Sequence, residues 1–170
     1  MNKLLIMIAL AVSSMSAIEI GEVPKHVTLE GDAGGLVAGG AWDSSSIKDK
    51  VHVVFYVDPD EKDTNDALAK ALKKENFDKS KYGTMAVVNL AATWKPNVII
   101  NALLKSKQKK FPDAIYAKDK NKALVKEWGL ADDSSDILIF DKAGKLLYSK
   151  AGKLDNAEIV KVIALINANL

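Results

Sequence analysis

Four carboxylates crowd into six positions and form the densest set of side chains that could do chemistry: Asp58, Asp60, Glu61 and Asp63. Carboxylate oxygens at this density could hold Ca²⁺ or Mg²⁺, and a pair of them in a cleft could act as general acid and base. The spacing differs from an EF-hand loop, because no glycine and no distant bidentate glutamate follows. The alternative is structural, since acidic side chains favour the positive N-terminal end of a helix, and we favour it here.

Serine and histidine are the remaining candidates for nucleophilic chemistry. Ser134 or Ser135 could form a Ser-His-Asp site with His52, but the chain has no Gly-x-Ser-x-Gly elbow. His52 lies within an apolar run, where we expect a hydrogen-bonded core imidazole. His26 is the other histidine, and two are too few for a histidine-only metal site. We therefore assign no catalytic residue, metal or cofactor.

Composition excludes whole classes of function. The 170 residues contain no cysteine, so the chain has no disulfide, thiolate nucleophile or dithiol redox centre. All 24 basic residues are lysine, and the net charge is only +2. Without arginine the chain lacks the planar fork that reads guanine and clamps phosphate, so we expect no nucleic-acid partner.

Lysines gather after one predicted helix, at Lys105, Lys107, Lys109 and Lys110. A solvated face that complements the negative helix end is the expected reason. Weak docking to anionic lipid or to an envelope polymer is the functional alternative. Trp94 and Trp128 are expected in the core or at its rim.

The segment Met1–Ala17 has the pattern of a secretory signal peptide. Lys3 precedes the nine apolar residues 4–12, and small residues follow, with cleavage expected after Ser16 or Ala17. Nine apolar residues are about half of the ~20 that a membrane span needs. We therefore predict an exported chain with a single domain over 18–170 and no transmembrane segment after cleavage.

Hydrophobic periodicity predicts alternating strands and helices. The predicted strands are Val51–Val57, Thr84–Leu90, Ala114–Ala117, Asp136–Asp141 and Leu146–Ser149. The predicted helices run from a Thr64 cap to Asn76, onward from Pro96, from Lys122 to Trp128 before Gly129, and onward from Asp155. The pairs Gly34-Gly35 and Gly39-Gly40 indicate turns, and a phosphate loop is the alternative, although no Gly-Lys-Ser/Thr follows.

Side-chain patterns add detail to three of these helices. The first carries Ala67, Leu68, Ala71 and Leu72 on one face, and the last opens with an Asp155/Glu158 capping box. The helix after Pro96 carries the apolar Val98, Ile99, Ala102 and Leu103. The order β-α-β-α-β-α-β-β-α predicts an α/β domain, a mixed sheet with helices on both faces, and a thioredoxin-like sheet matches it best.

This architecture resembles the thioredoxin superfamily. In its active members the first buried strand leads into Trp-Cys-x-x-Cys, and a cis-proline precedes the hairpin strand. The resemblance implies that Asp60 and Asp63 stand where those cysteines would be, and Ser134-Ser135 where the cis-proline loop would be. In redox relatives that loop contacts the substrate.

The chain also resembles the YtfJ-like family of bacterial periplasmic proteins, which has a thioredoxin-like fold and no assigned activity. The residues that carry the resemblance are Ile20-Gly-Glu-Val-Pro24, Lys50-Val51, Val87-Val-Asn89, Phe111-Pro112, Trp128-Gly-Leu130, Ser134-Ser135 and Asp141-Lys-Ala-Gly144. The family supplies no catalytic residues, and it implies the periplasm of a Gram-negative envelope.

We therefore expect a redox-inactive, non-enzymatic protein that binds an envelope protein or peptide. The expected binding rim consists of Asp60, Asp63, Ser134 and Ser135. The alternatives are a divalent-cation-dependent or carboxylate-based enzyme that uses the 58–63 cluster, and a plain structural or stress-protective role. The oligomeric state stays open.

Overall fold

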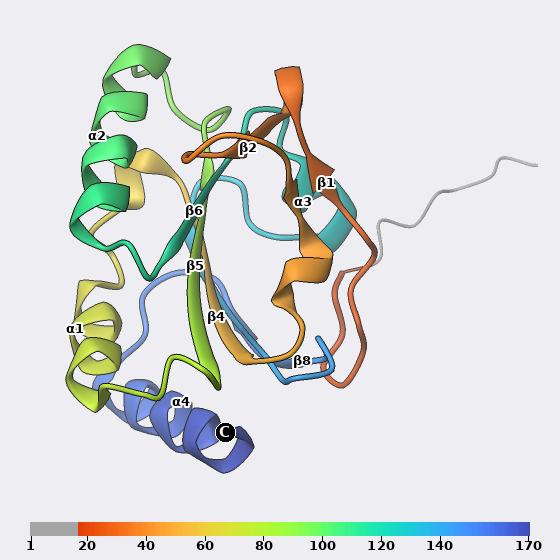
Figure 1. Ribbon diagram of the computed structural model, residues 1–170, viewed down its shortest axis with the longest axis vertical. Coiled ribbons are helices and arrows are strands. Elements are labelled where there is room, and N and C mark those ends of the chain that lie inside the picture. The colour runs from red at the N-terminus through yellow and green to blue at the C-terminus, as the bar shows by residue number, and fades with distance from the viewer. Residues whose placement is uncertain (1–16) are drawn as a thin grey trace, which may run out of the picture.

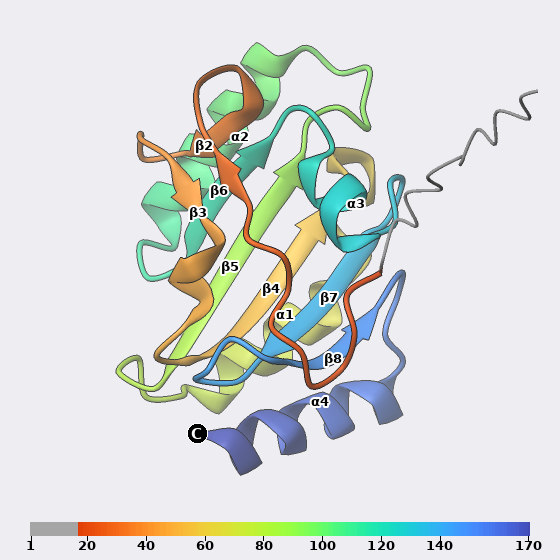
Figure 2. The same ribbon diagram turned by 90° about the vertical axis from the view of Figure 1, so that its right-hand side faces the viewer.

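A six-stranded mixed sheet organises the computed structural model, which describes residues 17–170. The strand order is β2-β6-β5-β4-β7-β8, with β4, β5 and β6 parallel and the other strands antiparallel to their neighbours (Figure 2). The strands are β2 (Gly34–Leu36), β4 (Val51–Val57), β5 (Tyr82–Asn89), β6 (Ile115–Asp119), β7 (Ser135–Phe140) and β8 (Leu146–Lys150). A separate two-stranded ladder pairs β1 (Thr28–Leu29) with β3 (Trp42–Asp43).

Helices cover both faces of the sheet, which confirms the predicted α/β class (Figure 1). On one face lie α1 (Asp66–Glu75), α2 (Asn97–Lys110) and α4 (Asn156–Asn169). On the other lie α3 (Ala123–Trp128) and the N-terminal segment with its short 3-10 helices η1 (Gly31–Ala33) and η2 (Ser44–Ile47). A third 3-10 turn, η3 (Pro59–Glu61), connects β4 to α1.

The strand β4 is at the centre because its side chains are apolar on both faces. Val51 and Val53 pack with α1 and α4, while Val54 and Tyr56 pack with the N-terminal segment and α3. On the latter face the indoles of Trp42 and Trp128 meet edge to face, with their centroids 6.4 Å apart. The prediction of a strand buried on both faces is confirmed.

Two predicted element details are also confirmed, and a third is confirmed in part. Gly129 ends α3 in the left-handed conformation. Asp155 and Glu158 form the reciprocal capping box of α4. Leu68 and Leu72 of the predicted face of α1 are buried and Ala71 is half-buried, whereas Ala67 is exposed.

The beginning of α1 differs from the prediction. Asn65, not Thr64, is the N-cap, because the Thr64 hydroxyl instead donates to Glu61 Oε2 (2.5 Å) and completes the turn that follows η3. The Asn65 side chain does not cap the helix; it reaches across to β7.

The apolar side chains of α2 differ more. Ile100 and Leu104 pack against β5 residues, whereas the predicted Val98, Ile99 and Leu103 are 75%, 53% and 55% exposed. Trp94, expected in the core or at its rim, is 87% exposed.

The two glycine pairs differ: Gly39 and Gly40 lie in the turn after β2, as predicted, whereas Gly34 and Gly35 lie in β2 itself. Gly34 and Gly35 pair with Asp119 and Lys118 of β6, and a Cβ on Gly34 would lie 1.8 Å from the Lys118 carbonyl oxygen. For Gly34 and Gly35 the phosphate-loop alternative is therefore wrong, because these two glycines serve close strand contact.

The signal-peptide prediction falls almost entirely on residues 1–16, outside the described part of the chain. Ile18 is bonded to the domain through its N–H, which donates to the Trp128 carbonyl oxygen over 3.0 Å. Within residues 17–170, no helix has both the length and the apolar character required to span a membrane.

Candidate functional site

Two segments far apart in the sequence meet at the carboxyl edge of the parallel strands. The N–H of Asp58, directly after β4, donates to the carbonyl oxygen of Ser134, directly before β7, over 2.8 Å. Nδ2 of the buried Asn65 lies 3.1 Å from both the carbonyl oxygen and the hydroxyl of Ser135. The fold thus brings together the two segments that carry the predicted binding rim.

Asp60 faces the loop between β5 and α2. Its carboxylate pairs with the Lys95 ammonium and accepts a 2.6 Å hydrogen bond from the Thr93 hydroxyl. The hydrogen bonds from Lys95 and Thr93 hold the pKa of Asp60 below its usual value, so the carboxylate is ionised at neutral pH. Its negative charge is partly offset by Lys95, a partner that the sequence pattern did not indicate.

The other three rim residues differ in accessibility. Asp63 is 67% exposed and pairs with its neighbour Lys62, whose hydrogen bond lowers the pKa of Asp63. Ser134 is half-buried, and its hydroxyl accepts from the Gly152 N–H over 3.0 Å. Ser135 is only 2% exposed. The accessible part of the rim is therefore Asp60, Asp63 and the outer surface of Ser134, while Ser135 supports it from within.

The four acidic residues of this loop do not converge. Asp58 is buried and accepts the Asp60 N–H over 2.8 Å, Glu61 accepts from Thr64, and Asp60 and Asp63 pair with different lysines. Across residues 17–170, no three histidine or acidic side chains are grouped so that they could hold a metal ion. Each carboxylate already has its own protein partner.

Sequence reasoning missed a buried polar group at the same edge, on the α3 side of the sheet. The Tyr56 hydroxyl donates to Asp119 Oδ2 (3.0 Å), and both side chains are buried. The Asp119 carboxylate also accepts the N–H groups of Ala123 (2.9 Å) and Leu124 (3.0 Å), so it anchors the first turn of α3. Burial, followed by the nearby Asp119 charge, raises the pKa of Tyr56, which therefore stays protonated.

Two acceptors in this polar group have no hydrogen-bond donor: Asn89 Oδ1 and Asp136 Oδ1. The Asn89 amide donates to Asp132 Oδ1 (2.9 Å), and Asp136 Oδ2 accepts the Ala131 N–H (2.7 Å), so consecutive residues of one loop cover both side chains. Burial raises the pKa of Asp136. The available signal was a polar residue at the carboxyl end of an otherwise apolar strand, as in Val87-Val-Asn89.

The Ser-His-Asp alternative is not assembled. His52 pairs with Phe140 at one end of the β4–β7 ladder, while Ser135 pairs with Val57 at the other end. The predicted core imidazole is confirmed: His52 is buried, and its Nδ1 lies 3.1 Å from the Ile47 carbonyl oxygen. Burial lowers the pKa of His52, so it is neutral at physiological pH.

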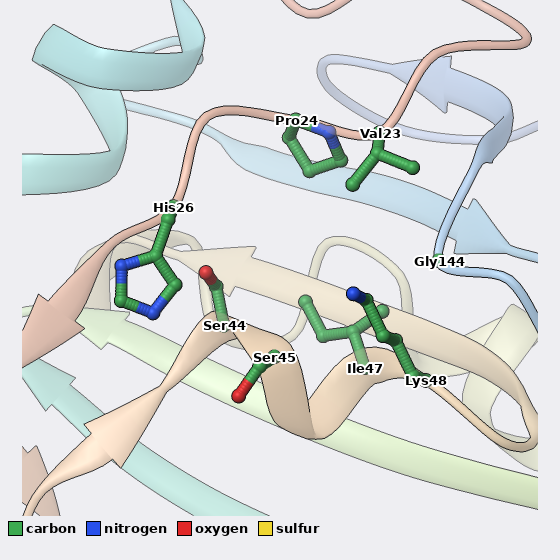
Figure 3. Close-up of a pocket in the computed structure, with 8 residues that line it drawn as sticks. All are labelled: Val23, Pro24, His26, Ser44, Ser45, Ile47, Lys48 and Gly144. Atoms are coloured by element: carbon green, nitrogen blue, oxygen red, sulfur yellow. The ribbon is translucent and has the colours of Figure 1, made fainter.

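A pocket of about 50 Å³ lies between the N-terminal segment, η2 and the β7–β8 turn (Figure 3). At its margin His26 Nε2 is 2.9 Å from both Asp43 carboxylate oxygens, and the Ser45 hydroxyl donates to the same carboxylate over 2.5 Å. Because Ser45 bonds to the carboxylate rather than to the imidazole, the histidine does not activate it as a nucleophile. This pocket is separate from the rim.

Comparison with solved structures identifies the fold as thioredoxin-like. A thiol-disulfide isomerase from Corynebacterium glutamicum superposes with a TM-score of 0.59, covering 94% of this chain and 98% of its own at 16% identity. A hypothetical protein from Sinorhizobium meliloti gives a TM-score of 0.64, covering 91% and 85% of the two chains at 16% identity. At this identity the likeness concerns the fold alone.

Sequence comparison gives the family. Residues 14–169 match a family described as a bacterial protein of unknown function, YtfJ_HI0045. An uncharacterized protein of Haemophilus influenzae is 31% identical over 130 residues, covering 74% of this chain and 70% of its own. The uncharacterized protein YtfJ of Escherichia coli is 25% identical over 128 residues, again covering 74% and 70%. The chain therefore belongs to the YtfJ family, which confirms the resemblance inferred from its motifs.

Proposed function

We propose that this protein is a redox-inactive, non-enzymatic member of the thioredoxin-like fold that binds a protein or peptide in the bacterial envelope. The binding surface is the accessible part of the predicted rim, Asp60, Asp63 and Ser134, and the buried Ser135 supports it from within. The location in the envelope rests on the sequence pattern of Met1–Ala17.

One observation carries this proposal: the two loops of the rim are fixed to one another without any cysteine. The Asp58–Ser134 main-chain bond and the Asn65–Ser135 contacts hold the loops in place. A pre-organised surface loses little conformational entropy on binding, which favours a recognition role. A carboxylate enzyme is less well supported, because Asp60 and Asp63 each pair with a lysine and stay ionised.

In-cell photo-cross-linking tests the proposal. A photoreactive amino acid at position 60 or 63 should give a discrete protein adduct, and one at the exposed position 113, in the turn before β6, should not. The adduct formed from position 63 should also disappear in Asp60→Ala. The matched control is Asp113→Ala, which likewise removes an exposed aspartate paired with a lysine. Unchanged cross-linking in Asp60→Ala, or equal adducts from position 113, would remove the rim from the proposed function.

A further inference from the structure

The outward face of α2 is apolar in its first half. Val98, Ile99 and Leu103 point away from the sheet at helical spacing, and the 87% exposed Trp94 precedes them. The core does not need these side chains, since Ile100 and Leu104 already fill the contact with β5. A group of large exposed apolar side chains that includes a tryptophan is typical of an interaction site.

The second half of the same helix is cationic. Lys105, Lys107, Lys109 and Lys110 are exposed, and within residues 17–170 none of them forms an ion pair. Lys110 lies over the Phe111 ring, 5.4 Å from its centroid. The helix therefore presents an apolar half followed by a positive half along its axis.

This surface is continuous with the rim. Thr93 and Lys95, on either side of Trp94, both bond to Asp60, and the charge of Lys107 contributes to lowering the pKa of Asp63. Asp60 of η3 therefore contacts the loop that leads directly into α2. A partner bound at the rim would meet the exposed face of α2.

We propose that this α2 surface, Trp94 with Val98, Ile99, Leu103 and the four lysines 105, 107, 109 and 110, docks an acidic amphipathic segment of a partner protein. Apolar side chains of the segment cover the tryptophan half, and its carboxylates meet the lysine half. The proposal rests on the proposed binding function and names the chemistry of the partner.

The axial separation of the two halves favours a peptide over a lipid surface. A helix that lies in a membrane interface carries its apolar stripe along its whole length, with lysines on the polar face. On α2 the lysines instead follow the apolar residues along the helix axis. A complementary peptide therefore has an apolar part next to the first half of α2 and an acidic part next to the second half. Charge complementarity of this kind gives specificity and raises the association rate.

Trp94 provides a direct readout, because Trp42 and Trp128 are each only 1% exposed. The probe is a synthetic peptide with leucine and phenylalanine in its first half and glutamate in its second. Binding should shift the tryptophan emission to the blue and protect it from iodide. We expect a Kd on the order of tens of micromolar by calorimetry.

Two variants and a matched control decide the assignment. Leu103→Ser and the charge reversal Lys107→Glu/Lys110→Glu should each weaken peptide binding by about tenfold. At high salt the difference in affinity from the unsubstituted protein should become smaller for the charge reversal but not for Leu103→Ser. Val160→Ser removes a 68% exposed aliphatic side chain from α4 and should leave binding unchanged. Circular dichroism and urea unfolding should be alike for all three proteins.

Three results would overturn the proposal. The first is the absence of saturable binding at about millimolar peptide. The second is a shift of the Trp94 emission with phosphatidylglycerol vesicles but not with the peptide, and the third is a shift of this emission that depends on protein concentration without any ligand, together with a doubled mass of the protein in solution. The last two would assign the surface to a membrane or to a second copy of the chain. If rim cross-links persist while peptide binding fails, only this inference falls; if α2 binds while the rim gives no adduct, only the rim assignment falls.

Discussion

At the scale of single residues, an unpaired buried oxygen at the carboxyl edge of the sheet lowers the stability of the fold. Asp136 is 2% exposed, keeps one oxygen without a donor, and has its pKa raised by burial. A buried acceptor without a partner costs free energy, and a charged one costs more. The folded protein therefore tolerates Asp136 at neutral pH at the expense of stability.

We predict that Asp136→Asn stabilises the protein by about 1 kcal/mol at pH 7. The folded state has the higher Asp136 pKa, so the free energy of unfolding falls as pH rises from the unfolded value of about 4 through the folded value. Asp136→Asn does not titrate, so its free energy of unfolding does not fall in this way. The difference in free energy of unfolding between the variant and the unsubstituted protein should therefore become small as the pH approaches 4. Urea unfolding at several pH values, with the exposed Asp113→Asn as control, measures the difference. An advantage independent of pH would contradict this account.

Asn65 has a larger expected effect, because its one amide bonds to three residues in two other segments, β7 and the loop before α4. Nδ2 contacts Ser135 and the Gly152 carbonyl oxygen (3.0 Å), and Oδ1 accepts the Leu154 N–H (3.0 Å). We predict that Asn65→Ala destabilises the fold by about 3 kcal/mol, since buried groups lose their partners. Asn156→Ala, at an exposed position, should change urea unfolding little. A loss of similar size in both variants would show that the network is not responsible.

At the scale of elements, local signals were predictable wherever one residue type decides a conformation. The helix end at Gly129 and the Asp155/Glu158 capping box each depend on residues within about one helical turn. Both could therefore be predicted from the local sequence alone. Thr64 and Asn65 are both good caps, and only the contact with Ser135 decides which role each takes.

The capping box gives an element-scale prediction. Asp155 Oδ1 accepts the Glu158 N–H, and Glu158 Oε2 accepts the Asp155 N–H, both over 2.8 Å. Asp155→Ala should lower the free energy of unfolding by about 1 kcal/mol. Asp66→Ala, which removes an exposed first-turn aspartate without a capping bond, should cost only a few tenths of that. Equal losses in thermal unfolding would indicate that charge, not the cap, stabilises α4.

The burial of α2 and the candidate site were harder to predict. The helix α2 has apolar side chains on two of its sides, Ile100 with Leu104 and Val98 with Ile99 and Leu103. Only the packing against β5 determines that Ile100 and Leu104 are the buried pair. In the site, the loop positions followed from topology, whereas the Asp60–Lys95 pair joins two loops and has no sequence signal. The strand β2 was missed because its pattern is mostly glycine and its pairing depends on β6.

At the scale of the whole molecule, the first question is whether the protein needs a divalent cation bound at its acidic loop, residues 58–63. A cation at residues 58–63 would have to displace lysines, a hydroxyl and a main-chain N–H. We predict no calorimetric binding of Ca²⁺, Mg²⁺ or Mn²⁺ tighter than about 1 mM. Micromolar affinity, abolished by Asp60→Asn but retained by Asp113→Asn, would favour the cation-dependent alternative.

Export is also tested on the whole chain. We predict that the full-length protein, expressed in a Gram-negative host, is released by osmotic shock with a mass that begins at Ala17 or Ile18. Ile8→Lys interrupts the apolar residues 4–12 and should leave the full-length chain in the cytoplasm, while Ile20→Lys, beyond the predicted cleavage site, should not. An uncleaved chain in the cytoplasm without any substitution would contradict the prediction.

The strand order also determines when the molecule can fold. Gly34 pairs with Asp119 and His52 pairs with Phe140, so these strand pairs form only after a much later part of the chain is available. Closing such long loops before any contact forms makes folding slow relative to chains with local contacts. Neither the first strand of the sheet nor its centre is complete until most of the polypeptide has been synthesised. We therefore expect the nascent chain to stay unfolded for longer, which is compatible with the export predicted from residues 1–17.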